Sequence, residues 1–127
     1  MQDFRQLKVW VKAHENALHI YRHLQNFPGS EKFALSNQIW RASISIGSNI
    51  AEGCGCQSRR GFARYLGIAF ASASELEYQI ILSMDLKYLT VETAGSILTQ
   101  ITQIKRMLNR LIIRLQEADT LESATDD

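Results

Sequence analysis

Hydrophobic residues recur at helical spacing along four segments of the chain. Residues three and four apart share one face of an α-helix, so each segment predicts an amphipathic helix with one side toward a core. The predicted helices span about residues 4–26, 30–52, 58–86 and 90–116. The hydrophobic residues of the last segment keep heptad spacing without a miss, at Ala94, Ile97, Ile101, Ile104, Leu108, Leu111 and Leu115.

Polar and turn-forming residues separate these segments. Ser30, Ser58 and Thr90 are placed to cap the second, third and fourth helices. Gly53 suits the left-handed conformation that often follows a helix end. Short joints of this kind imply antiparallel neighbours, so the sequence predicts an all-α fold. We expect an up-down-up-down antiparallel four-helix bundle forming one domain over residues 1–116.

Small residues crowd the two middle segments. Small side chains let helices approach closely, either inside one bundle or between subunits. The hydrophobic stripes of the first and last segments are wider than a monomeric core requires, so both alternatives stay open. The small residues are Ala42, Ser43, Ser45, Gly47, Ser48 and Ala51, followed by Gly67, Ala69, Ala71, Ser72, Ala73 and Ser74.

The composition is that of a globular domain. The 127 residues are 46% hydrophobic and 21% charged, enough to bury a core without disulfides or metal. No stretch approaches the roughly 20 apolar residues of a membrane span. The N-terminus also lacks the pattern of a signal peptide. We therefore expect a soluble, cytoplasmic protein with no membrane partner.

The formal net charge of +1 conceals an uneven distribution. Five of the thirteen acidic residues lie in residues 117–127, which contain no basic residue. Residues 1–116 contain the remaining eight acidic residues and all fourteen basic residues, so they carry a net charge of +6. The acidic segment 117–127 is expected to be a disordered tail.

Basic residues without acidic neighbours form the candidate functional surface. No acid lies between Glu52 and Glu75 or between Glu92 and Glu117. Charges of both signs usually alternate on a solvated helix, because like charges four residues apart repel. In an antiparallel bundle many of these bases gather at one end, where they would attract a phosphate backbone. The alternative is that the acidic tail folds back and neutralises that end. The candidate nucleic-acid-binding residues are Arg59, Arg60, Arg64, Lys105, Arg106, Arg110 and Arg114, with Arg5, Lys8 and Lys12 expected nearby.

Residues that commonly carry chemistry are scarce. Cys54 and Cys56 would supply only two zinc ligands and lack the spacing of a redox pair, so we expect two thiols in a turn. His19 and His23 are four apart, but no third ligand lies near them, and His14 falls on the hydrophobic stripe as an expected core or interface residue. We expect no catalytic residue, no metal site and no cofactor.

Two stretches resemble the four-helix bundle family of 23S rRNA intervening-sequence proteins. They are "FPGSEKFALSNQIWRASISIGSNIAEG" at residues 27–53 and "FARYLGIAFASASELEYQI" at residues 62–80, and the resemblance extends over about residues 4–115. It implies a bundle that assembles as a ring, a homopentamer in known members, without known catalysis. Some members have no settled function. Others are accessory variability proteins of diversity-generating retroelements, which bind RNA and a partner reverse transcriptase through a basic surface.

Several polar residues are shared with this family pattern. We interpret them as a structural network at helix–helix faces, where polar groups must satisfy one another. Within it, Arg41 is predicted to pair with Glu75 or Glu52. The set consists of Gln38, Arg41, Asn49, Glu52 and Glu75.

The sequence therefore favours a non-enzymatic oligomeric adaptor. Its basic surface would bind RNA or an RNA–DNA hybrid and a reverse transcriptase, as the accessory protein of a retroelement does. The alternative is a family scaffold protein that acts through protein–protein contacts without nucleic acid.

Overall fold

The computed structural model describes residues 2–31 and 34–125. These residues form helices and contain no β-strand, so the predicted all-α class is confirmed for them. Two short 3₁₀ turns precede the first two α-helices. The elements are η1 (Phe4–Gln6), α1 (Lys8–Leu24), η2 (Gly29–Glu31), α2 (Leu35–Cys54), α3 (Arg59–Asp85) and α4 (Val91–Thr125).

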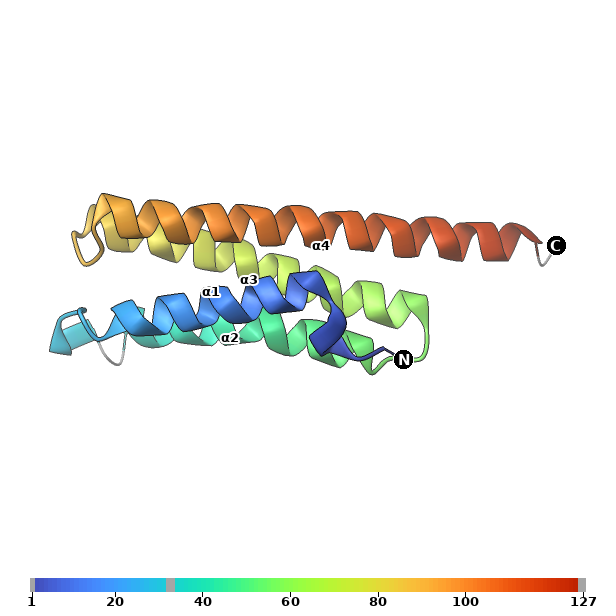
Figure 1. Cartoon of the computed structure of the whole chain (residues 1–127), viewed down its shortest axis with the longest axis horizontal. Coiled ribbons are helices and arrows are strands. Elements are labelled where there is room, and N and C mark those ends of the chain that lie inside the picture. The colour runs from blue at the N-terminus through green and yellow to red at the C-terminus, as the bar shows by residue number, and fades with distance from the viewer. Residues whose placement is uncertain (1, 32–33, 126–127) are drawn as a thin grey trace.

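The four α-helices lie along the long axis of the molecule (Figure 1). α2 packs against α3, α3 packs against α4, and α1 contacts both α2 and α4. The start of α3 and the C-terminal part of α4 lie at the same end of the molecule (Figure 1). The N-terminal segment lies there too, because the Gln2 amide donates a hydrogen bond of 3.2 Å to the Cys54 carbonyl.

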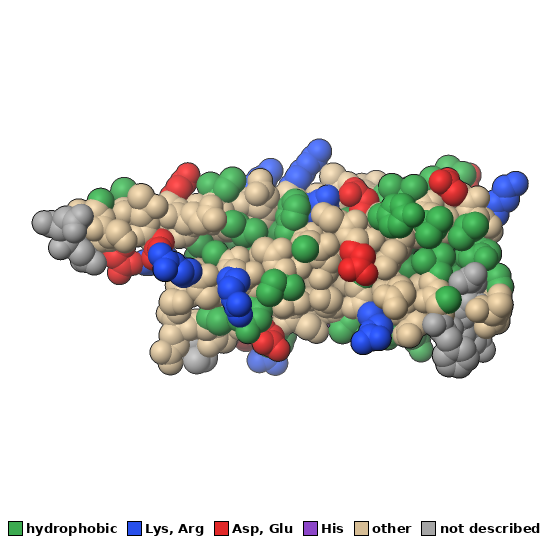
Figure 2. Space-filling view, turned by 180° about the vertical axis from the view of Figure 1, so that it is seen from behind, with side chains coloured by type: hydrophobic (Ala, Val, Ile, Leu, Met, Phe, Trp, Pro, Cys, Tyr) green, Lys and Arg blue, Asp and Glu red, His purple; other side chains and the backbone are tan. Residues whose placement is uncertain are grey.

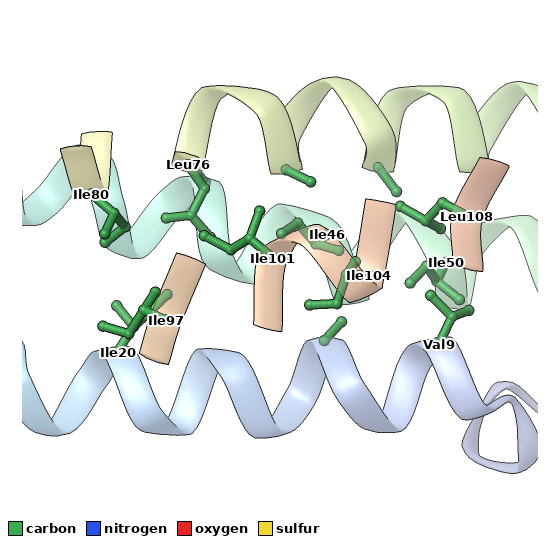
Figure 3. Packing of buried hydrophobic residues seen from close by; sticks show 14 of the residues in the cluster. Val9, Ile20, Ile46, Ile50, Leu76, Ile80, Ile97, Ile101, Ile104 and Leu108 are labelled. Carbon is green, nitrogen blue, oxygen red and sulfur yellow. The ribbon is translucent and has the colours of Figure 1, made fainter. Parts of the chain in front are cut away.

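Branched aliphatic side chains from all four helices fill the centre (Figure 3). Ile97, Ile101, Ile104 and Leu108 of α4 are completely shielded from solvent, which confirms the heptad pattern for this part of the helix. Burying one such side chain stabilises the fold by roughly 1.5–3 kcal/mol. Their partners in the core include Val9 and Ile20 of α1, Ile46 and Ile50 of α2, and Leu76 and Ile80 of α3.

Two of the three predicted N-caps are confirmed. The Ser58 hydroxyl accepts a hydrogen bond of 3.0 Å from the Gly61 amide at the start of α3. Thr90 Oγ1 likewise accepts from the Thr93 amide, at 3.1 Å, at the start of α4. The prediction for Ser30 is wrong because this residue lies in the turn η2. α2 begins only at Leu35, without a side-chain cap.

Gly53 is a helix residue and not a left-handed one, so that prediction is also wrong. It lies inside α2, and no glycine among the described residues has a positive φ. Its role is close packing: a Cβ at Gly53 would lie 2.8 Å from Phe62 Cδ1 and 3.1 Å from Tyr65 Cβ. The absence of a side chain therefore lets the end of α2 approach α3.

The fourth helix is longer than the hydrophobic pattern predicted. α4 continues as regular helix through Thr125, so the acidic segment expected to be a disordered tail is helical up to that residue. It projects beyond the other three helices (Figure 1). The segment after residue 116 contains no glycine or proline to end the helix, and alanine, leucine and glutamate favour its continuation. Asp126 and Asp127 lie outside the described residues.

Small residues pack α2 tightly against α3. Ala42, Ala69 and Ala73 are buried, and the Ser45 and Ser72 hydroxyls form a hydrogen bond of 2.8 Å between the two helices. Packing within the chain is therefore confirmed for these positions. Other small residues, namely Ser48, Gly67 and Ala71, lie exposed on the surface.

The predicted polar network forms only in part. Asn49 donates to the carbonyl oxygen and the hydroxyl of Ser45, at 2.8 and 3.0 Å, and so extends the Ser45–Ser72 contact. Glu75 accepts a hydrogen bond of 3.0 Å from Gln79. Arg41 is exposed and forms no ion pair with any described residue, so the predicted pairing with Glu75 or Glu52 is not present. Gln38 and Glu52 also lie exposed.

Candidate nucleic-acid interface

Two grooves flank the C-terminal half of α4. The first, here called the α3–α4 groove, has a volume of about 460 Å³. Three arginines from the first two turns of α3 lie along one side of it. Its lining consists of Arg59, Arg60, Ala63, Arg64, Leu115, Gln116, Asp119 and Thr120.

The second groove lies on the other side of α4, against the start of α1, and is called the α1–α4 groove. It has a volume of about 410 Å³ and holds one lysine and two arginines. Its lining consists of Gln6, Leu7, Lys8, Val9, Met107, Arg110, Leu111 and Arg114. α4 thus separates two basic depressions at one end of the molecule.

Helix geometry explains why these arginines face solvent. On α4 the hydrophobic residues Leu108 and Leu111 turn toward the bundle, which leaves Arg110 and Arg114 on an exposed face. On α3 the Ser58 cap starts the helix immediately before Arg59, and no acid occupies the first turn. Positive side chains here add to the partial positive charge of the helix N-terminus, so the potential at this end favours anions.

Most of the groove arginines lack an acidic partner. Among the residues that the structure describes, no carboxylate lies within ion-pair distance of Arg60, Arg64, Arg110 or Arg114. The Arg64 guanidinium lies 5.3 Å from the centre of the Tyr65 ring, a cation–π contact that leaves its charge available to an anion. These four side chains are free to neutralise phosphates.

Two predicted site residues lie outside both grooves. Lys105 forms an ion pair of 3.2 Å with Glu77 on α3, and its ammonium lies 5.1 Å from the centre of the Phe70 ring. These contacts assign Lys105 to the joint between α3 and α4. Arg106 is exposed one turn before Arg110 and extends the basic face toward the middle of α4.

Of the three further basic residues expected near this end, only one lines a groove. Lys8 lines the α1–α4 groove. Arg5 instead pairs with Asp3 at 3.1 Å, and this hydrogen bond lowers the pKa of the Asp3 carboxyl. Lys12 lines neither groove.

Acidic residues of the α4 extension enter the α3–α4 groove. Glu122 forms an ion pair with Arg59, and Asp119 lines the groove beside the three arginines. Figure 2 shows basic and acidic side chains side by side where the projecting helix leaves the bundle. The alternative given above, neutralisation of this end by the acidic segment, therefore applies at Arg59, through a helix and not through a folded-back tail.

The cysteines form no disulfide. Cys54 is the last residue of α2 and is buried, and this burial raises the pKa of its thiol, with a smaller contribution from the charge of Asp3. Cys56 follows in the turn and donates a weak hydrogen bond of 3.7 Å to the Glu52 carbonyl. The expectation of two turn thiols is thus wrong for Cys54, whose side chain belongs to the core.

Of the histidines of α1, His14 is exposed and His19 and His23 are half-buried. His14, predicted as a core or interface residue, does not lie in the core of the chain: it is exposed and stacks on Trp10, with ring centres 4.9 Å apart. A place at an interface between subunits stays a prediction. His19 contacts Gln100 Oε1 at 3.1 Å through Nδ1, and its ring lies 5.3 Å from that of His23. Over the described ranges, no three His, Cys, Asp or Glu side chains are grouped so as to hold a metal ion.

A buried polar contact between α1 and α4 was not predicted. Asn16 is completely buried, and its Nδ2 donates a hydrogen bond of 2.9 Å to Gln100 Oε1. Among the residues that the structure describes, none donates a hydrogen bond to Asn16 Oδ1. The available signal was the spacing of Asn16 from Ala13 and Ile20, which places it on the buried face of α1.

A third depression is apolar and lies between α1 and α2, with a volume of about 320 Å³. Leu18 and Ile44 at this depression are 43% and 42% exposed. Beside it, the Tyr21 and Trp40 rings lie 4.9 Å apart. We call this surface the α1–α2 face; it consists of Phe4, Trp10, His14, Ala17, Leu18, Tyr21, Trp40, Ile44, Gly47 and Ser48.

Four packed helices with two basic grooves define a helical protein with a candidate surface for polyanions. The family model of the 23S rRNA-intervening sequence protein matches residues 5–110, and the chain belongs to this family. Its fold is similar to the crystal structure of a protein with unknown function from the S23 ribosomal protein family of Bacteroides thetaiotaomicron. The two share 35% sequence identity with a TM-score of 0.77, over 82% of this chain and 97% of that one. Among curated proteins, none matches the chain significantly.

Within the described ranges, no helix combines the length and apolar character that crossing a bilayer requires.

Proposed function

We propose that this protein is a non-enzymatic adaptor that binds RNA, or an RNA–DNA hybrid, through the two grooves flanking α4. The observation that carries the proposal is the set of four arginines in these grooves without an acidic partner among the described residues, at Arg60, Arg64, Arg110 and Arg114. Neutralising phosphates with these side chains releases condensed counterions, which favours binding and requires no base-specific contact. If all four contact phosphates of a duplex, the logarithm of the affinity should fall against the logarithm of salt concentration with a slope of roughly −3.6.

The test is RNA binding measured over a range of salt concentrations. A fluorescently labelled RNA hairpin is titrated with wild-type protein and with the double variant Arg110→Glu and Arg114→Glu. We expect steeply salt-dependent binding by the wild type and a weakening of more than tenfold in the variant, since two attractive contacts become repulsive. Arg22→Glu, at an exposed position that lines neither groove, is the control and should have little effect. Salt-insensitive binding, or none at low salt, would refute the proposal.

We further propose that the up-down-up-down bundle assembles into a ring, a homopentamer as the family resemblance implies. The α1–α2 face supports this proposal because it combines apolar and aromatic side chains with a depression between two helices. Assembly would place several pairs of basic grooves on one particle and raise the apparent affinity for a long RNA.

Light scattering coupled to size-exclusion chromatography tests this assembly. Ile44→Glu should reduce the particle to a smaller species, since it places a charge in an apolar contact. Val91→Glu is a matched control, because Val91 is 69% exposed and lies outside the α1–α2 face. An unchanged particle mass in the Ile44 variant would exclude this face as the subunit interface.

Family resemblance supports a role as the accessory variability protein of a diversity-generating retroelement, with a reverse transcriptase as partner, and we propose a cytoplasmic location for it. Co-purification of the two proteins, with and without nuclease, tests this part of the proposal. Loss of the complex after nuclease treatment would indicate that RNA connects them.

The second candidate function is a scaffold that binds proteins without nucleic acid. The exposed α1–α2 face and the Arg59–Glu122 pair favour it, because the first suits a protein partner and the second reduces the charge available to RNA. Nuclease-resistant capture of an acidic protein, lost when Arg59, Arg60 and Arg64 are replaced, would support this function over RNA binding.

A further inference from the structure

The extension of α4 places its acidic residues selectively. Of the acids beyond residue 116, Glu122 pairs with Arg59 and Asp119 lines the α3–α4 groove. Glu117 lies on another side of the same helix, in a shallow depression with Ile113 and Leu121. Two carboxylates of the extension therefore lie beside the arginines of α3, whereas the carboxylate of Glu117 lies elsewhere.

These carboxylates compete with phosphate for the same groups. A carboxylate and a phosphate both accept charge-assisted hydrogen bonds from a guanidinium, and Arg59 cannot give its full set of donors to both. Asp119 adds a negative charge to the groove, which lowers its attraction for a second anion even though no direct pair forms.

The contact is also weak enough to be displaced. The Arg59 and Glu122 side chains are 45% and 58% exposed, and exposed ion pairs add little to stability. Glu122 belongs to the last turns of α4, the helix that projects past the other three (Figure 1), and terminal helix turns of this kind open readily. A polyanion with several phosphates can therefore exchange with the two carboxylates.

We infer that the C-terminal extension of α4 is an autoinhibitory element that occupies the α3–α4 groove with Asp119 and Glu122 until an RNA backbone displaces it. This inference rests on the proposed RNA binding and names its regulation. Access of RNA to the α3–α4 groove then depends on displacement of the extension, whereas no acid of the described residues lines the α1–α4 groove. We also expect that short RNAs, with few phosphates to compete, are discriminated against relative to long ones.

The experiment compares two charge-matched double variants of the full chain. Asp119→Asn with Glu122→Gln, called the groove-acid variant, removes the acid that lines the groove and the acid that pairs with Arg59. Glu92→Gln with Glu117→Gln removes two acids outside the groove. Both change the net charge by the same amount. We expect the first to bind the RNA hairpin roughly three- to tenfold more tightly than wild type, with a salt slope steeper by roughly 0.9 per phosphate contact regained. The second should change affinity less than twofold, and circular dichroism should show the same helix content in both.

Replacement of Arg59 tests the named contact. Arg59→Gln should weaken RNA binding by less in the wild type, where RNA must first displace Glu122 from this side chain. In the Asp119→Asn and Glu122→Gln background the same change should remove most of the gained affinity. Such non-additivity is the signature of direct coupling between neighbouring groups.

The outcomes separate the inference from the proposed function. Equal tightening by both double variants, or no tightening by either, overturns autoinhibition and leaves RNA binding intact. RNA binding by the groove-acid variant alone, with none by wild type, supports both. Absence of binding by every variant at low salt overturns both, because a released α3–α4 groove would then still fail to attract RNA.

Discussion

Replacing Gly53 with alanine perturbs the closest approach of α2 to α3. The new Cβ would lie 2.8 Å from Phe62 Cδ1 and 3.1 Å from Tyr65 Cβ. Non-bonded carbon atoms prefer about 3.5–4.0 Å, so Phe62 must move by about 0.7 Å or α2 must retreat. Phe62 is only 8% exposed and has little space into which it can shift.

The expected destabilisation follows from two opposing contributions. Overpacking of a core costs about 1–3 kcal/mol. In a helix interior, alanine stabilises the folded protein relative to glycine by about 0.5–1 kcal/mol. This gain is smaller at Gly53, which lies next to the end of α2. Gly67→Ala is the matched control, because a Cβ there meets nothing within 4 Å and only the gain remains. We expect the alanine variant at Gly53 to be less stable than the control by about 1–3 kcal/mol.

The measurement is urea unfolding followed by circular dichroism, at one protomer concentration because assembly would raise apparent stability. The midpoint should fall for Gly53→Ala and stay constant or rise for Gly67→Ala. Gly95→Ala, where a Cβ again meets nothing within 4 Å, should behave as Gly67→Ala does. Equal stabilities for the variants at Gly53 and Gly67 would refute the packing argument.

The remaining predictions concern the core, its buried amide and the two thiols. Ile104→Ala should cost about 2–5 kcal/mol because the side chain is fully buried, whereas Ile113→Ala, 44% exposed on the same helix, should cost less than half as much by urea unfolding. Asn16→Ala should lower the free energy of unfolding, measured by thermal unfolding, by about 1–3 kcal/mol, because Gln100 on α4 loses the hydrogen bond from Asn16. Iodoacetamide should label Cys56 much faster than Cys54 in native protein, as followed by mass spectrometry, and equal rates would contradict the burial of Cys54. Burial raises the pKa of the Cys54 thiol in the folded protein, so the stability that it contributes is complete below the ordinary thiol pKa. The free energy of unfolding should then fall as pH rises from that value through the raised folded pKa. Cys54→Ser should remove this fall at the alkaline end of a stability–pH profile.

Local sequence patterns predicted structural features correctly where both interacting groups lie close together in the sequence. The caps Ser58 and Thr90 follow from hydrogen bonds to amides three residues away, so neighbouring sequence contains both partners. The exposed arginines Arg110 and Arg114 follow from the position of Leu108 and Leu111 on the same helix. Each of these features depends on residues within one or two turns.

The local sequence could not show contacts whose partner came from another helix. Gly53 looked like a helix stop because glycine often is one, but the approach of Phe62 from α3 decides its role. His14 lies on the hydrophobic stripe by spacing, yet it is exposed, so it is not a core residue of the chain and a place at a subunit interface stays a prediction. Lys105 belongs to the acid-free stretch in sequence, and only the packing of α3 on α4 brings Glu77 within 3.2 Å of it.

The chain's own sequence determined the four α-helices seen in the described residues, the heptad core of α4 from Ala94 to Leu108, and the concentration of bases without nearby acids. Periodicity and charge order are local properties, and helix geometry converts them into faces. Tertiary structure alone decided which charges meet. It separates the arginines into two grooves, and it brings Glu122 to Arg59 although the two lie on different helices and far apart in sequence. Ion pairs act over a few ångströms, so their partners are set by how long α4 is and where it passes α3.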